Sequence, residues 1–155
     1  MINNLDELVL YLKENNMHIS FAESLTGGLA VATLVNISGA SNVLDESFVT
    51  YAEKAKMKLL KVKKKTLKLH TVVSEEVAYE MAKGLHKLSN ADICISTTGI
   101  AGPTSDGINP VGRVCFGFYI NGNIITRKVE FGDIGRNEVR NKAVDFLFKE
   151  LFKLL

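Results

Sequence analysis

The chain has 155 residues, 46% of them hydrophobic and 23% charged, with a formal net charge of +2. This length and composition fit one globular domain with a sizeable core. The small net charge argues against a nucleic-acid binder driven by bulk charge, and no stretch approaches the ~18 apolar residues of a membrane span.

The first half of the chain mixes helical and strand-like patterns. Leu5, Leu8 and Leu12 follow helical spacing, which predicts an amphipathic helix at 4–15. The short apolar run 18–22 predicts the first strand. A buried helix, a strand and a charged helix are then predicted, at 26–37, 43–52 and 53–60.

The second half begins with Ser74, which can cap a helix at 74–88. A buried strand is predicted at 91–98, and 99–112 is predicted as a loop because it holds both prolines and four glycines. Asn121-Gly122 predicts a hairpin. Its strands and the last helix are expected at 114–120, 124–131 and 136–154.

This order of elements predicts an α/β fold: a single-domain α/β/α sandwich over residues 1–155. The sheet is expected to be mixed and mostly parallel, with one antiparallel hairpin. Cys94 and Cys115 fall in apolar strand-like runs. We expect both to be buried in a reducing compartment, and neither to form a disulfide or a metal site. The N-terminus lacks a basic region followed by an apolar run, so a cytoplasmic location is expected.

Ser24 is the most informative residue, because it stands where a strand pattern changes to a helical one. A hydroxyl there lies beside the N–H donors of Thr26, Gly27 and Gly28, which favour negative charge. Such a site can bind a phosphate or the oxyanion formed when a nucleophile attacks a carbonyl. The alternative is that this residue is only a helix cap.

A serine nucleophile needs a base, and the three histidines do not supply an obvious one. Only His70, in a connecting segment, is retained as an alternative candidate for the base. A lysine can serve if its pKa falls from ~10.4 towards ~7–8. Lys56 is the best placed, five residues after Tyr51, although a solvated charge is the default for any lysine here. No His, Cys and Asp spacing fits a metal site.

Lysines cluster in the same region, where a solvated basic face is the default interpretation. No aromatic residues interleave with them as a stacking surface for nucleic acid would require. The members of the cluster are Lys54, Lys56, Lys58, Lys61, Lys63, Lys64 and Lys65.

Five motifs, in order over about residues 5–150, resemble the CinA C-terminal family, whose characterised activity is nicotinamide-nucleotide amidase. They are Ala22-Glu23-Ser24-Leu25-Thr26-Gly27-Gly28; Gly39-Ala40-Ser41 with Tyr51-Ala52-Glu53-Lys54-Ala55-Lys56; Val73-Ser74-Glu75-Glu76-Val77-Ala78 with Met81-Ala82; Thr98-Gly99-Ile100-Ala101-Gly102-Pro103 with Pro110-Val111-Gly112; and Phe131-Gly132-Asp133 with Arg136 and Val139-Arg140. Two departures stand out. The family usually has cysteine at Leu25, and its arginine directly follows Gly-Asp, whereas Ile134-Gly135 intervene here.

The resemblance implies a stand-alone amidohydrolase that converts nicotinamide mononucleotide to nicotinic acid mononucleotide and ammonia. Its serine–lysine pair falls on Ser24 and Lys56, with Tyr51 close by. The substrate-binding residues would be Thr26, Gly27 and Gly28, whose N–H groups would stabilise the oxyanion, and the loop Thr98, Gly99, Ala101 and Gly102, which would bind the substrate's phosphate together with Arg136 or Arg140.

The expected partners are the nucleotide and a second copy of the chain, as a homo-oligomer with a dimer favoured. No metal, cofactor, nucleic acid or membrane is expected. The alternative function is a non-catalytic nucleotide-binding or competence/damage-associated interaction module.

Overall fold

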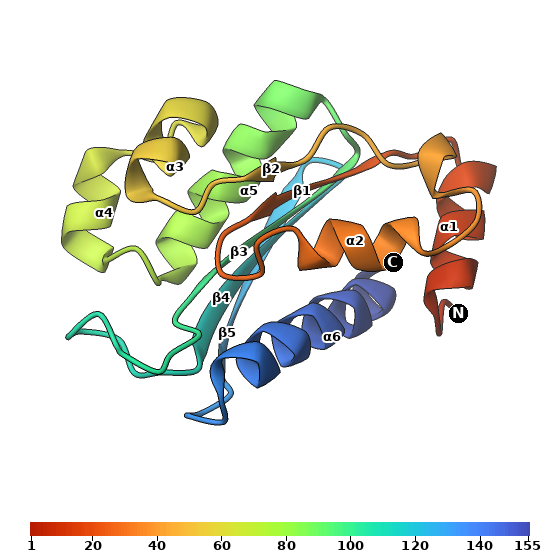
Figure 1. Cartoon of the computed structure of the whole chain (residues 1–155). Helices are drawn as coiled ribbons and strands as arrows, with labels where there is room; N and C mark the ends of the chain where they lie inside the picture. Colours follow the sequence, from red (N-terminus) through yellow and green to blue (C-terminus); the bar gives the residue numbers. More distant parts are fainter.

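In the computed structural model, which describes all 155 residues, a five-stranded sheet separates two layers of helices (Figure 1). The strand order is β2-β1-β3-β4-β5. The strands are β1 Ile19–Glu23, β2 Phe48–Val49, β3 Ile93–Gly99, β4 Arg113–Ile120 and β5 Asn123–Glu130.

The sheet is mixed, as predicted. β1 pairs in parallel with β2 and with β3, whereas the β3–β4 and β4–β5 pairs are antiparallel. The sheet is therefore half antiparallel, more than the single hairpin that the sequence predicts. The reason is the loop at 100–112, which returns the chain directly beside β3 instead of crossing over through a helix.

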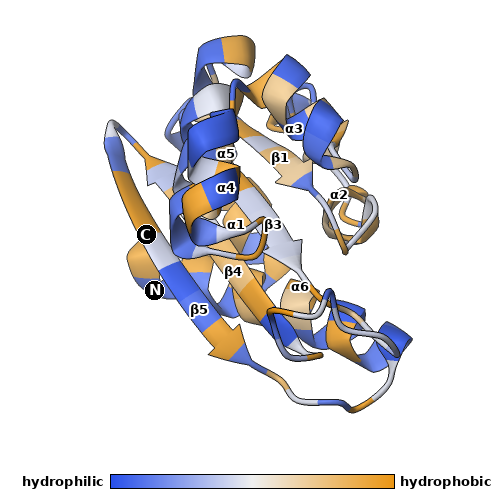
Figure 2. Ribbon diagram, turned by 90° about the vertical axis from the view of Figure 1, so that its left-hand side faces the viewer, coloured by the Kyte–Doolittle hydropathy of each residue, from blue (hydrophilic) through white to orange (hydrophobic).

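Helices cover both faces of the sheet. One face carries α1 Leu5–Glu14, α2 Leu29–Val35 and α6 Arg136–Leu154; the other carries α3 Glu53–Leu60, α4 Lys64–His70 and α5 Glu75–Ser89. A core of 22 buried residues lies under the first group and one of nine under the second. Figure 2 shows hydrophobic residues along β1 and β4, between the layers. No helix is both long enough and apolar enough to cross a membrane.

Three predicted elements differ from the structure. The helix expected at 26–37 begins only at Leu29, because Gly27 and Gly28 adopt φ values of 58° and 103° and form a turn. The strand expected at 43–52 shrinks to the two residues of β2, at the sheet edge. The sequence also missed α4, which the lysine-rich composition of this segment disguised.

The topology brings distant segments together at one edge of the sheet. Because β1, β2 and β3 run in parallel, Ser24, Tyr51 and the loop that starts at Ile100 all follow strands that end at this edge. The helix α6 also begins there, after β5. Polar groups from four parts of the chain therefore meet at the carboxyl ends of the strands, where α/β folds usually place their sites.

Candidate active site

The centre of the site is a direct hydrogen bond between Ser24 and Lys56. The Nζ atom of Lys56 lies 2.9 Å from the Oγ atom of Ser24. Both side chains are buried: Lys56 is 1% exposed and Ser24 7% exposed. The turn after β1 carries the hydroxyl. The amine belongs to the fourth residue of α3 and reaches the hydroxyl from the other helical layer.

Burial lowers the pKa of Lys56 from 10.5 to about 8, and the nearby carboxylate of Glu53 opposes that shift. Desolvation disfavours the ammonium form because its charge is no longer hydrated. The lysine is therefore partly neutral near pH 8, as a general base must be.

The other two partners of Lys56 are backbone carbonyls. Its Nζ donates to the oxygen of Thr50 at 2.7 Å and to that of Tyr51 at 3.2 Å. Carbonyls only accept, so the two hydrogens of a neutral amine satisfy both, and the lone pair is left for the hydroxyl of Ser24. This arrangement points the lone pair of a neutral amine at the hydroxyl of Ser24.

The turn that carries Ser24 is anchored to β3 and to α2. The Ser24 N–H donates to the Thr97 hydroxyl at 3.2 Å, and that hydroxyl also bonds to Thr26. The buried carboxylate of Glu23 accepts from the N–H groups of Ala30 and Val31, at the start of α2. Those helical donors are therefore occupied by the protein's own carboxylate.

Arg140 of α6 orients the same turn. Its guanidinium donates to the carbonyls of Leu25 and Thr26, at 2.9 and 3.1 Å. In a trans peptide the N–H points away from the carbonyl, so the Thr26 N–H points away from Arg140. The N–H groups of Leu25, Thr26 and Gly28 donate to no acceptor within the protein. Of the three, only Leu25 lines the neighbouring cavity, so its N–H remains available to an anion there.

A cavity of about 260 Å³ opens beside the Ser24–Lys56 pair. Arg136 closes one side, donating to the Gly102 carbonyl at 2.6 Å and to the Tyr51 hydroxyl at 2.9 Å. The guanidinium keeps further N–H donors for an anion. The lining residues are Ser24, Leu25, Tyr51, Glu53, Lys56, Val72, Val73, Thr98, Gly99, Ile100, Ala101, Gly102, Thr104 and Arg136.

Most of the predicted site residues line this cavity, but Thr26, Gly27, Gly28 and Arg140 do not. The Thr26 side chain faces Thr97 inside the protein, and the two glycines shape the turn. Of the two arginines considered for phosphate, only Arg136 reaches the cavity, despite the two residues inserted before it.

The positions of the histidines, the cysteines and the other side chains that could bind a metal are also defined. No histidine lines the cavity, and His70 lies on α4 with its Nδ1 3.8 Å from a carboxylate oxygen of Glu76. Nowhere do three or more His, Cys, Asp or Glu side chains gather as a metal site would require. Cys94 and Cys115 are free and buried, as predicted.

Sequence reasoning assigned no role to Glu23, Glu53 or Thr97. Glu23 could have been noticed as a lone charge at the end of an apolar strand. The roles of Glu53 and Thr97 depend on contacts between separate segments, which no local pattern encodes.

Together, these features define an α/β protein with a mixed sheet and a buried serine–lysine pair at its carboxyl edge. Residues 3–155 match the model of the CinA C-terminal domain, and the chain belongs to that family.

Curated relatives from several bacteria are similar. The chain is 43% identical over 158 residues to a CinA-like protein of Kosmotoga olearia, covering 98% of this chain and 38% of the relative. It is 49% identical over 147 residues to a putative competence-damage inducible protein of Clostridium tetani, covering 91% and 36%. The chain therefore spans less than two-fifths of the length of these relatives.

Solved structures share the whole fold. A competence-damaged protein (CinA) superfamily protein from Escherichia coli matches with a TM-score of 0.91 and 32% identity, over 98% of this chain and 91% of that one. The competence/damage inducible protein CihA from Agrobacterium tumefaciens matches with a TM-score of 0.88 and 36% identity, over 99% and 97%.

Proposed function

We propose that the chain is an amidohydrolase that deamidates nicotinamide mononucleotide, with Ser24 as nucleophile and Lys56 as base. The observation that carries this proposal is the 2.9 Å contact between the Ser24 hydroxyl and a buried lysine of lowered pKa. Desolvating a lysine costs stability, and a module that only binds a nucleotide gains nothing from that cost. The choice of substrate rests on membership of the family.

In the first half of the reaction, neutral Lys56 takes the proton of Ser24 while Oγ attacks the carboxamide carbon. The tetrahedral intermediate places its negative charge on the former carbonyl oxygen. The N–H of Leu25, which lines the cavity and donates to no acceptor within the protein, is suited to stabilise this charge. One such donor is commonly worth ~3–4 kcal/mol.

In the second half, the Lys56 ammonium gives its proton to the leaving nitrogen as the C–N bond breaks, and ammonia departs. A water molecule then attacks the acyl-enzyme, and Lys56 accepts a proton from that water. Collapse of this second intermediate returns the proton to Ser24 Oγ and releases the acid. Tyr51 lines the cavity, and its hydroxyl accepts a hydrogen bond from Arg136. The scheme uses no metal or organic cofactor.

We place the substrate's phosphate beside Arg136 and the loop formed by Thr98, Gly99, Ala101 and Gly102, all of which line the cavity. The amides of Ala101 and Gly102 donate no hydrogen bond within the protein. A guanidinium beside free amides is a favourable environment for a phosphate.

The remaining expectations stay proposals: a single amidohydrolase domain over 1–155, a cytoplasmic location and a homo-oligomer, with a dimer favoured. The names of the relatives connect them to competence and damage responses. Any such role for this chain would be additional to hydrolysis.

One assay tests the proposal: ammonia release from nicotinamide mononucleotide by wild type, Ser24→Ala and the matched control Ser38→Ala, which changes an exposed serine outside the cavity. We expect Ser24→Ala to keep its fold and lose several orders of magnitude in rate, with Ser38→Ala unchanged. A wild-type protein that binds the nucleotide without turning it over would favour the non-catalytic alternative.

A further inference from the structure

The positive charge of the chain is concentrated in one segment. Residues 54–74 contain eight lysines and no Asp or Glu. Removing these eight from the 19 basic residues leaves 11, against 17 acidic ones, so the rest of the chain carries −6. The net charge of +2, from which we expected no nucleic-acid partner, therefore conceals a strong local asymmetry.

In the structure, the lysines of this segment form an exposed basic surface. Seven of the eight lysines are exposed, and only Lys56 is buried. None of the seven forms a salt bridge. We call them the lysine face; its members are Lys54, Lys58, Lys61, Lys63, Lys64, Lys65 and Lys68.

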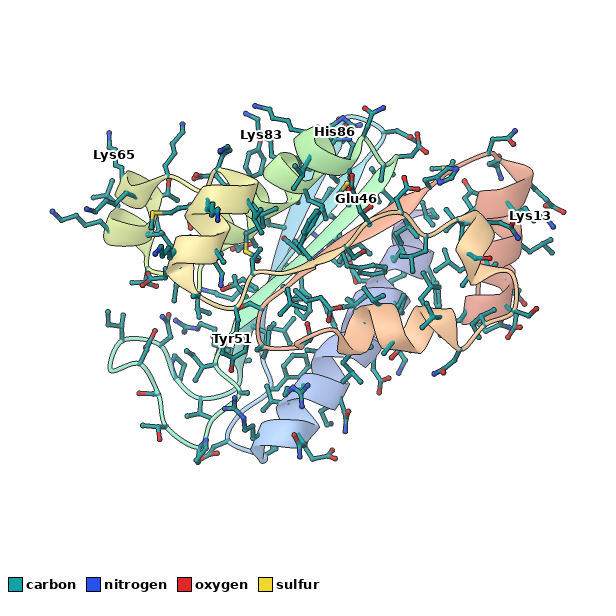
Figure 3. The ribbon with its side chains drawn as sticks, turned by 45° about the horizontal axis from the view of Figure 1, so that its top comes forward. Lys13, Glu46, Tyr51, Lys65, Lys83 and His86 are labelled. Atoms are coloured by element: carbon teal, nitrogen blue, oxygen red, sulfur yellow. The ribbon has the colours of Figure 1, made fainter.

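The two helices present these lysines in rows. Lys54 and Lys58 are four residues apart on α3, and Lys64 and Lys68 are four apart on α4, so each pair shares one side of its helix. Figure 3 shows Lys65 pointing outward from α4, away from Tyr51 at the mouth of the cavity. None of the seven lysines lines the cavity, so the lysine face is not part of the candidate active site.

Lys61 gives a second indication. It ends α3 with φ 59°, in the left-handed region that favours glycine. A lysine there strains the backbone, whereas a glycine would not. This lysine lies between α3 and α4 in the sequence, and its Nζ donates to the Lys58 carbonyl at 3.2 Å.

We propose that the lysine face binds the phosphate backbone of double-helical nucleic acid without reading its sequence. Lysine ammonium groups are point charges that suit phosphate oxygens, and backbone contacts carry no base information. Residues 52–78 contain no Phe, Tyr or Trp, the large aromatic side chains on which the bases of a single strand stack. Leu69 is the only large apolar side chain exposed on α4, too little for insertion into a membrane.

The test measures fluorescence anisotropy of a labelled 24-base-pair DNA duplex with the full chain at 50, 100 and 200 mM salt. The lysine-face variant is Lys64→Gln/Lys65→Gln/Lys68→Gln. The matched control, Lys13→Gln/Lys142→Gln/Lys149→Gln, removes the same charge from exposed positions on α1 and α6. Thermal unfolding checks that both variants are folded.

Four phosphate contacts would weaken wild-type binding on the order of 10²-fold between 50 and 200 mM salt. We expect the lysine-face variant to bind about tenfold or more weakly, with a salt slope smaller by about three, and the control to stay within about threefold. Equal losses in both variants would overturn the proposal, as would no binding at 50 mM salt. Tighter binding to a single strand of equal length would also overturn it, as would binding to phosphatidylserine vesicles but not to the duplex.

Discussion

The pH dependence of the proposed hydrolysis is the sharpest consequence of the buried lysine. Lowering the pKa of Lys56 from 10.5 to about 8 corresponds to roughly 3 kcal/mol in favour of the neutral amine. At pH 7 about one-tenth of the molecules would then carry a neutral Lys56, compared with roughly 0.03% for a solvated lysine. The fold would raise the concentration of active base about 300-fold.

We expect kcat/KM for ammonia release to rise tenfold per pH unit below pH 7 and to level off above an apparent pKa near 8. Lys56→Arg should be nearly inactive at every pH, because a guanidinium stays protonated. The matched control is Lys54→Arg, which changes an exposed lysine on the same helix and should keep the wild-type profile.

The free energy of unfolding should also depend on the protonation of Lys56. The folded pKa, about 8, lies below the unfolded value of 10.5, so the unfolded chain binds more protons between these limits. The free energy of unfolding should therefore rise with pH from about 8 to 10.5, by up to about 3 kcal/mol relative to Lys56→Met. A rate that rises only above pH 10, or a stability difference that does not change with pH, would show that Lys56 is an ordinary protonated lysine.

Four further results are expected. Arg140→Lys should lower kcat about 10²-fold with little change in KM, because it loses the paired contacts to the nucleophile turn. Arg136→Met should raise KM about tenfold or more for nicotinamide mononucleotide in steady-state kinetics. Nicotinamide riboside, which lacks the phosphate, should be a poorer substrate, and its turnover should be unchanged by this substitution. Gly84→Ala should lower the free energy of unfolding in urea by about 3 kcal/mol or more, since the added Cβ would overlap a backbone carbonyl of α3. Burial raises the pKa of Cys94 and Cys115 to about 12, so neither should react with an aromatic disulfide reagent at pH 8 until the protein unfolds.

The elements that the sequence predicted well are those whose local pattern agrees with their environment. The hairpin at Asn121-Gly122 and the helix α5, capped by Ser74, lie where they were expected. The helix α4 was missed because only Leu67 among its residues is buried, so it shows no apolar stripe. The strand expected at 43–52 has β-branched and aromatic residues, but at the sheet edge only Phe48 and Val49 pair with β1.

The candidate site likewise contains some residues that could be identified from the sequence and others that could not. Ser24, Tyr51 and Lys56 could be selected because a strand, a turn and a helix follow one another within a short stretch of sequence. Arg140 could not be assigned its contacts, since it reaches the Leu25 carbonyl across 115 positions of sequence. Such contacts depend on which end of α6 meets which end of β1, and side-chain periodicity does not contain that information.

The placement of Lys56 explains how the fold tolerates a buried amine. Its helix follows β2 after the connection 50–52, in which the carbonyls of Thr50 and Tyr51 accept hydrogen bonds from the amine. Those acceptors satisfy the amine but carry no full negative charge, so they orient it without fixing it as an ammonium ion. Glu53 raises the pKa only as the lesser influence. A carboxylate in direct contact would instead have kept the lysine protonated. The absence of a direct ion pair therefore leaves the buried amine of Lys56 able to lose its proton, as its proposed role of general base requires.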